Sequence, residues 1–211
     1  MTITECVIQI VFNNNLKWAT NDDANYTAAL TIMLSALQLI SLPLNGLGYG
    51  MQQYVTFNYG AGNSKRLIEG IKDITIITFC YAIVVRSLSL AFPKIYALMF
   101  SASDEVSDSV IKYTPLFLMG SIMFFVQMTL QNINVALGQA KFALVLAVLR
   151  KVIILIPLCI ILTHTIGFKG VYMSEGIADF VASIITSIVI FTTFLKVLKK
   201  CEEKVKNQIQ K

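Results

Sequence analysis

Long apolar runs separated by short polar segments dominate the 211-residue chain. A helix needs about 20 mostly apolar residues to cross the hydrocarbon core of a bilayer. Five runs reach that standard, and we expect each to form a membrane-spanning helix: Tyr26–Leu47, Ile74–Phe92, Tyr113–Leu137, Phe142–Leu162 and Ile177–Leu195. The pattern therefore predicts an all-α integral membrane protein, built as a bundle of helices.

A sixth apolar run, Ile3–Phe12, is too short to span and begins almost at the first residue. It is typical of the second half of a helix whose first half is missing. We therefore expect five full transmembrane helices plus one truncated N-terminal helix within residues 1–200. A basic tail, residues 201–211, follows on the cytoplasmic side.

One run is too long for a simple span. Residues 24–64 contain no charge, and as one helix they would extend about 62 Å at 1.5 Å per residue,. The hydrocarbon core is only about 30 Å thick. Because Pro43 lies inside this run and polar residues such as Gln52 and Asn58 follow it, we expect a kink near Pro43. A polar-lined continuation would follow, as is typical of a transporter's substrate path.

Another run, Phe142–Leu162, carries Arg150 and Lys151 near its middle. A charge at the bilayer centre costs at least about 2.5–3.5 kcal/mol on insertion scales. We therefore expect Phe142–Leu149 to lie near the cytoplasmic interface, with both charged side chains reaching water. The true span would then start after Lys151.

Composition narrows the function classes. Only 14% of the residues are charged and 56% are hydrophobic, whereas soluble domains carry roughly 25% charged residues,. The chain has a net charge of +5, but its Lys and Arg residues lie between the apolar runs and at the C-terminus, so we expect no nucleic-acid partner,. Twelve of these basic residues fall in one set of alternate segments and four in the other. This bias predicts a multi-pass protein of the cell (inner) membrane with a cytoplasmic C-terminus.

Metal and catalytic motifs are absent from the sequence. The four cysteines are far apart and the single histidine, His164, has no neighbouring ligand, so we expect no metal site and no cofactor beyond a coupling ion,. No Ser-His-Asp set or HExxH motif occurs either, and the chain is not expected to be an enzyme.

Three ordered blocks resemble one transporter family. The segment Pro43–Asn63, followed by Lys65 and Arg66, resembles the motif that ends the second helix of each lobe in the multidrug and toxic compound extrusion (MATE) transporters. Two further blocks are similar to the family's eleventh helix with its preceding turn and to the entry of its twelfth: Ala136–Lys141 with Leu149–Lys151 and Ile156–Leu158, and Gly167–Tyr172 with Ser174–Asp179. Gly176 stands where many relatives have proline. The resemblance covers residues 2–200.

The resemblance implies the C-terminal lobe of a twelve-helix transporter that starts inside the seventh helix. Such a protein exports small organic, often cationic, compounds in antiport with H⁺ or Na⁺, and this lobe would need an N-terminal lobe as its partner in the lipid bilayer. Two alternatives stay open. A related flippase for lipid-linked oligosaccharides would favour several cavity arginines, of which the chain has few. A single lobe could also be an inactive fragment.

Glu5 is the leading candidate for cation coupling, because it falls where some relatives carry a cation-linked glutamate in the seventh helix. Asn13 lies about two turns later, on roughly the same face. The alternative is a near-terminal charge without a role. Sodium-coupled relatives carry a second carboxylate in the tenth helix, but here Gln127 and Gln131 occur without an acid, which puts sodium coupling through this lobe in doubt.

The remaining candidates have weaker support. Pro43, Gln52, Asn58, Gln127 and Gln131 are candidates for the substrate path. Glu175 and Asp179, four residues apart, share a helix face near the outer interface, where we expect a structural role. Arg86 lies within a predicted span and should face protein or water, with Glu5 or Asp73 as its candidate partner.

Overall fold

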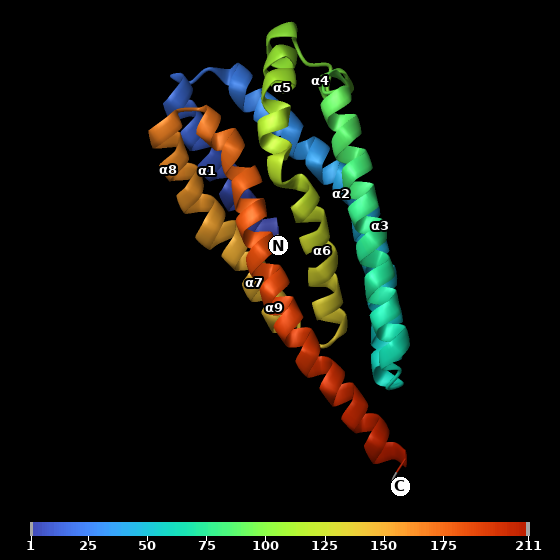
Figure 1. Cartoon of the computed structure of the whole chain (residues 1–211). Helices are drawn as coiled ribbons and strands as arrows, with labels where there is room; N and C mark the ends of the chain where they lie inside the picture. Colours follow the sequence, from blue (N-terminus) through green and yellow to red (C-terminus); the bar gives the residue numbers. More distant parts are fainter. Residues whose placement is uncertain (1, 210–211) are drawn as a thin grey trace.

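The computed structural model describes residues 2–209, with side chains for residues 4–189 and Thr192, and every regular element in that part is helical. The elements are α1 (Thr2–Thr20), α2 (Ala24–Gly60), α3 (Ser64–Ala91), α4 (Lys94–Met99), α5 (Asp104–Phe117), the 3₁₀ turn η1 (Leu118–Gly120), α6 (Ser121–Ala136), α7 (Ala140–Val148), the π-helical segment η2 (Leu149–Leu155), α8 (Ile156–Ile166) and α9 (Lys169–Ile209). They form an elongated bundle (Figure 1).

Five helical stretches among the described residues are long and apolar enough to cross a bilayer: Ala24–Gly60, Ser64–Ala91, Asp104–Ala136, Ala140–Ile166 and Lys169–Val189. They confirm the five predicted spans and the all-α fold. The helices extend beyond the apolar runs because polar residues at their ends continue the backbone hydrogen bonding. The side chains of the predicted basic tail, residues 201–211, lie outside the described residues.

The helix α1 continues through Asn13 to Thr20, well past the apolar run that predicts it. Ile8, Phe12 and Leu16, spaced four apart, bury one stripe of α1 in the main core of the bundle. In Figure 1, α1 begins at about half the height of the bundle and rises to its upper end. Glu5 lies in the first turn of α1.

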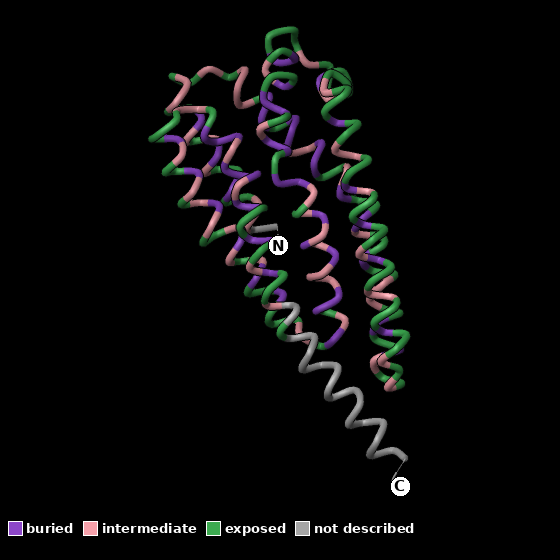
Figure 2. The backbone as a smooth tube through the Cα atoms, viewed as in Figure 1, coloured by how far each residue is buried: buried purple, intermediate pink, exposed green. Residues whose placement is uncertain are grey.

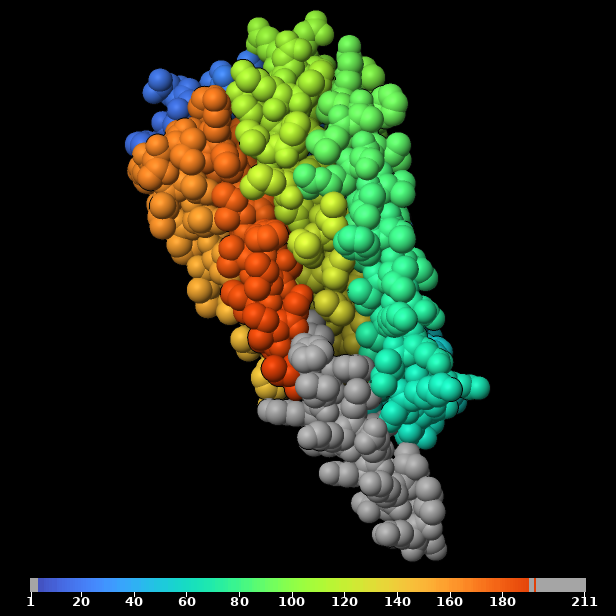
Figure 3. Space-filling view, viewed as in Figure 1, coloured from blue at the N-terminus to red at the C-terminus, as the bar shows by residue number. Residues whose placement is uncertain are grey.

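The helices form two groups that meet at α6 and α9. The helices α1, α7, α8 and α9 lie on one side of the bundle, and α2, α3, α5 and α6 lie on the other (Figure 1). On the face shown in Figure 3, α6 fills the space between α9 and α3. The α2–α3 and α6–α7 turns lie at the end towards which α9 extends, and the other connections lie at the opposite end. These are the two sets of segments that the basic residues distinguish.

Pro43 lies within α2, which is helical over its whole length. Proline lacks the N–H that would bond the carbonyl four residues earlier, and its ring disturbs the preceding turn. The carbonyl of Ile40, three residues before Pro43, accepts a hydrogen bond of 2.9 Å from the Tyr81 hydroxyl of α3. A side chain from the neighbouring helix thus stabilises the disturbed turn.

The span Asp104–Ala136 is broken at its middle by η1, which begins three residues after Pro115. The Arg86 guanidinium of α3 donates to the carbonyl oxygens of Leu118 and Met119 at this break. Arg86 therefore faces protein, as expected, but it binds these backbone carbonyls in place of Glu5 or Asp73. Gly120 at the end of η1 lies directly against the Gly176 backbone of α9, so α9 approaches the break closely.

The outer faces of α3 and of α7–α8 are apolar. Ile77 and Val84 of α3 are 51% and 56% exposed, and Ile153 of η2 is 62% exposed. Figure 2 shows the exposed residues along the outer side of α3 and the buried ones towards the bundle axis. Such faces fit contact with lipid tails, because a membrane helix satisfies its backbone internally and needs no water.

Candidate functional site

The segment Ala140–Ile166 is one continuous helix that contains η2 at its centre. This corrects the expectation that Phe142–Leu149 is interfacial and that the span starts after Lys151. Arg150 lies ten residues into the helix and is only 7% exposed, so it does not reach water. The expectation failed because it counted the cost of a lone charge, whereas the structure supplies partners. Single π-helical turns within α-helices frequently mark functional sites.

Arg150 pairs with two carboxylates of α9. Its Nε donates to Asp179 Oδ1 at 2.7 Å, and a terminal nitrogen also contacts that same oxygen. The same terminal nitrogen lies 3.3 Å from Glu175 Oε1. Asp179 is thus the close partner and Glu175 the distant one. The guanidinium carbon also lies 4.1 Å from the ring centre of Phe124, which covers one face of the cation,.

Lys151 points towards α1 and pairs with Glu5. The distance from Lys151 Nζ to Glu5 Oε1 is 2.7 Å, and the two side chains are 17% and 43% exposed. Adjacent residues of η2 therefore bind different helices, since Arg150 holds α9 and Lys151 holds α1. The two contacts join three helices at mid-height of the bundle.

Glu175 and Asp179 lie deeper than the sequence suggested. They are six and ten residues past the start of α9 at Lys169, which is about 9 and 15 Å at 1.5 Å per residue,. Asp179 therefore lies near the middle of a span whose hydrocarbon core is about 30 Å thick. Their exposed fractions are 7% and 2%. Helix α9 starts eight residues before the apolar run that predicted it, so both acids lie further along the helix than the sequence indicated.

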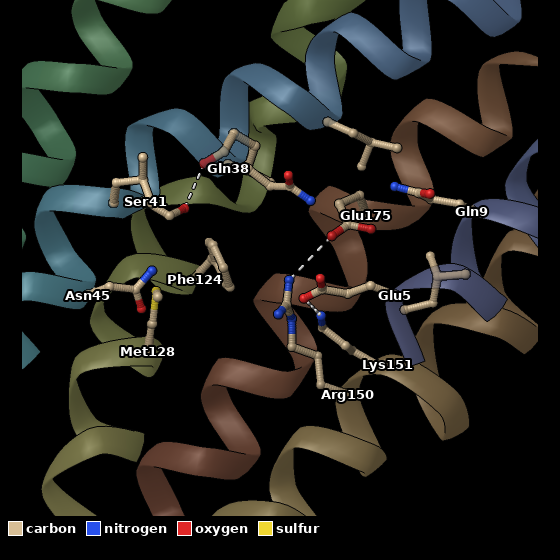
Figure 4. Close-up of a pocket in the computed structure, with 14 residues that line it drawn as sticks. Glu5, Gln9, Gln38, Ser41, Asn45, Phe124, Met128, Arg150, Lys151 and Glu175 are labelled. Atoms are coloured by element: carbon tan, nitrogen blue, oxygen red, sulfur yellow. Dashed lines mark hydrogen bonds and ion pairs between the residues drawn. The ribbon is translucent and has the colours of Figure 1, made fainter. Parts of the chain in front are cut away.

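A cavity of about 360 Å³ opens beside this charged cluster. It is lined by residues from five elements, α1, α2, α6, η2 and α9: Glu5, Ile8, Gln9, Leu34, Leu37, Gln38, Ser41, Leu42, Asn45, Phe124, Met128, Arg150, Lys151 and Glu175. Figure 4 shows Glu5, Lys151, Arg150 and Glu175 gathered on one side and Ser41, Asn45 and Met128 on the other. The cavity thus has one charged wall and one mixed polar and apolar wall, and its volume lies within the range of small-molecule sites.

Three carboxylates, Glu5, Glu175 and Asp179, face two cations in this cluster, a formal excess of one negative charge. Among the described residues, Glu175 Oε2 is buried and has no hydrogen-bond partner. No group of three or more His, Cys, Asp or Glu side chains in the described part of the chain is arranged to hold a metal ion. The cluster is therefore suited to a single monovalent positive charge.

The other candidates for cation coupling and for the substrate path either lie away from the cavity or form hydrogen bonds between helices. Asn13 and Pro43 are not among the residues that line the cavity. Gln127 donates to Thr186 of α9 at 3.1 Å, and Gln131 donates to the Ala143 carbonyl of α7 at 2.7 Å.

The two polar candidates further along α2 also bind protein. Gln52 lies 3.3 Å from Asn132 of α6. Asn58 is buried and donates to the Tyr54 carbonyl one turn earlier. It lies just before the turn in which Gly62 adopts a φ of +73° and Asn63 caps α3. The polar continuation of α2 therefore serves helix contacts and the turn.

Sequence reasoning missed the link between Arg150 and the acids of α9. A usable signal was present: an arginine in the middle of one apolar run is followed, in the next helix, by two acids spaced one turn apart. Opposite charges in neighbouring spans pair in preference to reaching water. Of the methionines and aromatic residues that could suit hydrophobic compounds, Phe124 and Met128 line the cavity.

Comparison with known proteins gives a consistent picture. Residues 1–161 match the model of the MatE family. The chain is 29% identical over 193 residues to Protein DETOXIFICATION 24 of Arabidopsis thaliana, covering 85% of this chain and 38% of that protein. Among solved structures, MATE in the bent conformation superposes with a TM-score of 0.86 at 17% identity, covering 95% of this chain and 44% of that one.

An outward-facing multidrug resistance MATE family transporter of the MOP superfamily superposes with a TM-score of 0.84 at 18% identity. That match covers 93% of this chain and 44% of the other. The chain thus spans less than half the length of the proteins it matches, and the likeness to the solved structures concerns the fold.

Proposed function

Because the chain belongs to the MatE family, we propose that it forms one lobe of a transporter that exports small organic, often cationic, compounds in exchange for H⁺ or Na⁺. The observation that carries the proposal is the cavity beside Glu5, Lys151, Arg150 and Glu175. In secondary transporters the substrate and coupling-ion sites lie near the bilayer midplane, and a drug-sized space beside charged groups fits such a site.

The second lobe would supply the opposite wall of the substrate path. The chain covers 38% of its plant relative and 44% of two solved chains, which supports a partner of similar size. The sequence resemblance implies that this partner is the N-terminal lobe. The loop ends carrying Lys65, Arg66 and Lys141 would face the cytoplasm with the C-terminus, in the cell membrane.

Glu5 remains our candidate for the group through which cation binding is coupled to export. Its carboxylate lines the cavity, and its contact with Lys151 joins α1 to η2. A change in charge at this contact would alter how α1 packs on the rest of the lobe. The flippase alternative has less support, since the single arginine lining the cavity, Arg150, already binds Asp179 and Glu175 and is not free for a diphosphate.

The proposal is tested by export of ethidium from drug-sensitive cells. The chain is expressed alone and fused behind the N-terminal lobe of a MatE transporter, and export is measured with a pH gradient or a Na⁺ gradient. We expect export from the fusion only, and a loss of at least tenfold in the Glu5→Gln fusion. The matched control is Asp22→Asn, which alters an exposed ion pair with Lys17 outside the cavity. Failure of the fusion to export ethidium or any other cationic dye would contradict the proposal, and export by the chain alone would show that no second lobe is needed.

A further inference from the structure

The charge balance of the cluster leaves one carboxylate without a counter-ion of its own. Lys151 lies 2.7 Å from Glu5, and Asp179 accepts two hydrogen-bonding contacts from Arg150. These two pairs are neutral. Glu175 Oε1 lies 3.3 Å from Arg150, which also binds Asp179. Glu175 Oε2 has no hydrogen-bond partner among the described residues. Glu175 is therefore the surplus acid of the cluster.

A buried carboxylate whose only cationic partner is shared with a second, closer acid is poorly stabilised in its ionised form. Burying an unpaired charge costs several kcal/mol, and the usual outcome is that the group becomes neutral instead. Only 7% of Glu175 is exposed, and its side chain lines the wall of the cavity. A proton there brings the cluster to neutrality and needs no ligands beyond the carboxyl group itself. A metal ion would need several oxygen ligands while facing two fixed cations.

The groups around Glu175 favour this assignment. From η2, Arg150 lies 3.3 Å from Glu175 Oε1 and Lys151 lines the same cavity, and from α1 Glu5 pairs with Lys151. Asp179 is the acid one turn along α9 itself. In the close-up, α6 presents Phe124 and Met128 and α2 presents Gln38, Ser41 and Asn45, all uncharged (Figure 4). The Arg86 of α3 is occupied by the η1 carbonyls.

We propose that Glu175 is the proton-exchanging carboxyl of this lobe, and that Glu5 and Lys151 set its state through the charge count of the cluster. This rests on the proposed transport function and specifies its ion site. With Glu175 protonated the charged wall is neutral, and with Glu175 ionised it carries one negative charge that a cationic compound in the cavity can balance. One proton is thus exchanged for one monovalent organic cation.

Charge-count variants separate Glu175 from Glu5. In Glu5→Gln, two acids remain with two bases, so Lys151 is free to balance Glu175 and the proton is no longer needed. In the double variant Glu5→Gln with Lys151→Met, two acids remain with one base, and the surplus returns to Glu175. In the double variant the acids that remain in the cluster are Glu175 and Asp179, so a band that returns there cannot come from Glu5.

The readout is the infrared carbonyl stretch of a protonated carboxylic acid, recorded at neutral pH on the full chain in lipid nanodiscs. We expect this band in the wild type and in the Asp22→Asn control, its loss in Glu175→Gln and in Glu5→Gln, and its return in the double variant. The return of the band in the double variant would show that an acid of α9 takes up the surplus proton, even if Glu175→Gln does not fold.

Three results would overturn the proposal: no band in the wild type, a band that survives in Glu175→Gln, or no return in the double variant. Adding Na⁺ in place of N-methylglucamine should leave the band unchanged, and its disappearance would assign the site to Na⁺ instead of the proton. The band requires no transport, so a fusion that exports dye without this pattern overturns the role of Glu175 and leaves the proposed function intact.

Discussion

Replacement of Arg150 by methionine tests how strongly the buried cluster stabilises the bundle. Arg150→Met removes the hydrogen-bonding partner of Asp179, which is 2% exposed, and the Arg150 contact of Glu175. Breaking a buried ion pair by removing one partner costs about 3–5 kcal/mol. For chains of this size, about 2–4 °C in Tm corresponds to 1 kcal/mol, so Tm should fall by about 6–20 °C.

The assay is thermal unfolding of the purified chain in detergent, followed by circular dichroism. A second variant combines Arg150→Met with Asp179→Leu and removes both partners while keeping the formal excess of one negative charge. Replacing a buried pair by apolar residues is often neutral, so the double variant should recover most of the lost stability. As a control, Lys17→Met breaks the exposed pair with Asp22, which should cost at most about 1 kcal/mol,.

Two results would refute this explanation of the stability of the cluster. A loss below about 1 kcal/mol in Arg150→Met would mean that the pair behaves like an exposed one. A double variant no more stable than Arg150→Met would mean that the loss comes from the packing of the arginine and not from the stranded carboxylate. The coupling energy of the double-mutant cycle gives this distinction directly.

Three further predictions concern helix contacts and use the same unfolding assay. Gly120→Ala should destabilise the bundle by about 1–3 kcal/mol, because the new methyl group would meet the Gly176 carbonyl oxygen, whereas Gly50→Ala, which meets open space, should be neutral or stabilising by up to about 1 kcal/mol,. Equal effects of the two changes would rule out a close approach of η1 to α9. Arg86→Met should cost about 1.5–3 kcal/mol, since it removes charged hydrogen bonds to the η1 carbonyls, and an unchanged Tm would contradict this role,. Tyr81→Phe should cost about 0.5–1.5 kcal/mol by removing the donor to Ile40 beside the proline, while a stabilising effect would show that the bond is not needed,.

The spans could be predicted because length and apolarity are local properties. The same holds for the disturbed turn before Pro43, which follows from a missing N–H at one position. The side chain that bonds this turn could not be predicted, since Tyr81 lies 41 residues away from Ile40 in the chain. Local patterns thus predict which segments are helical, but not which side chains meet.

The charged site shows the same limit more sharply. Taken alone, Arg150 and Lys151 carry charges that cost free energy to bury in a membrane, so the sequence favours their exposure to water. Their carboxylate partners lie 29 and 146 residues away. The resemblance singled out Glu5, whereas the surplus negative charge falls on Glu175. The sequence could not show this, because only the three-dimensional arrangement shows which cation pairs with which acid.

The exchange of one proton for one organic cation at Glu175 is tested by counting the protons released when a cation binds. Tetraphenylphosphonium is added to the chain in weakly buffered solution near neutral pH, and released protons are measured with a pH-indicator dye. Because competition between two ligands for one charge is reciprocal, about one proton should be released per bound tetraphenylphosphonium in the wild type and none in Glu175→Gln. Binding without proton release in the wild type, or undiminished release in Glu175→Gln, would contradict this exchange.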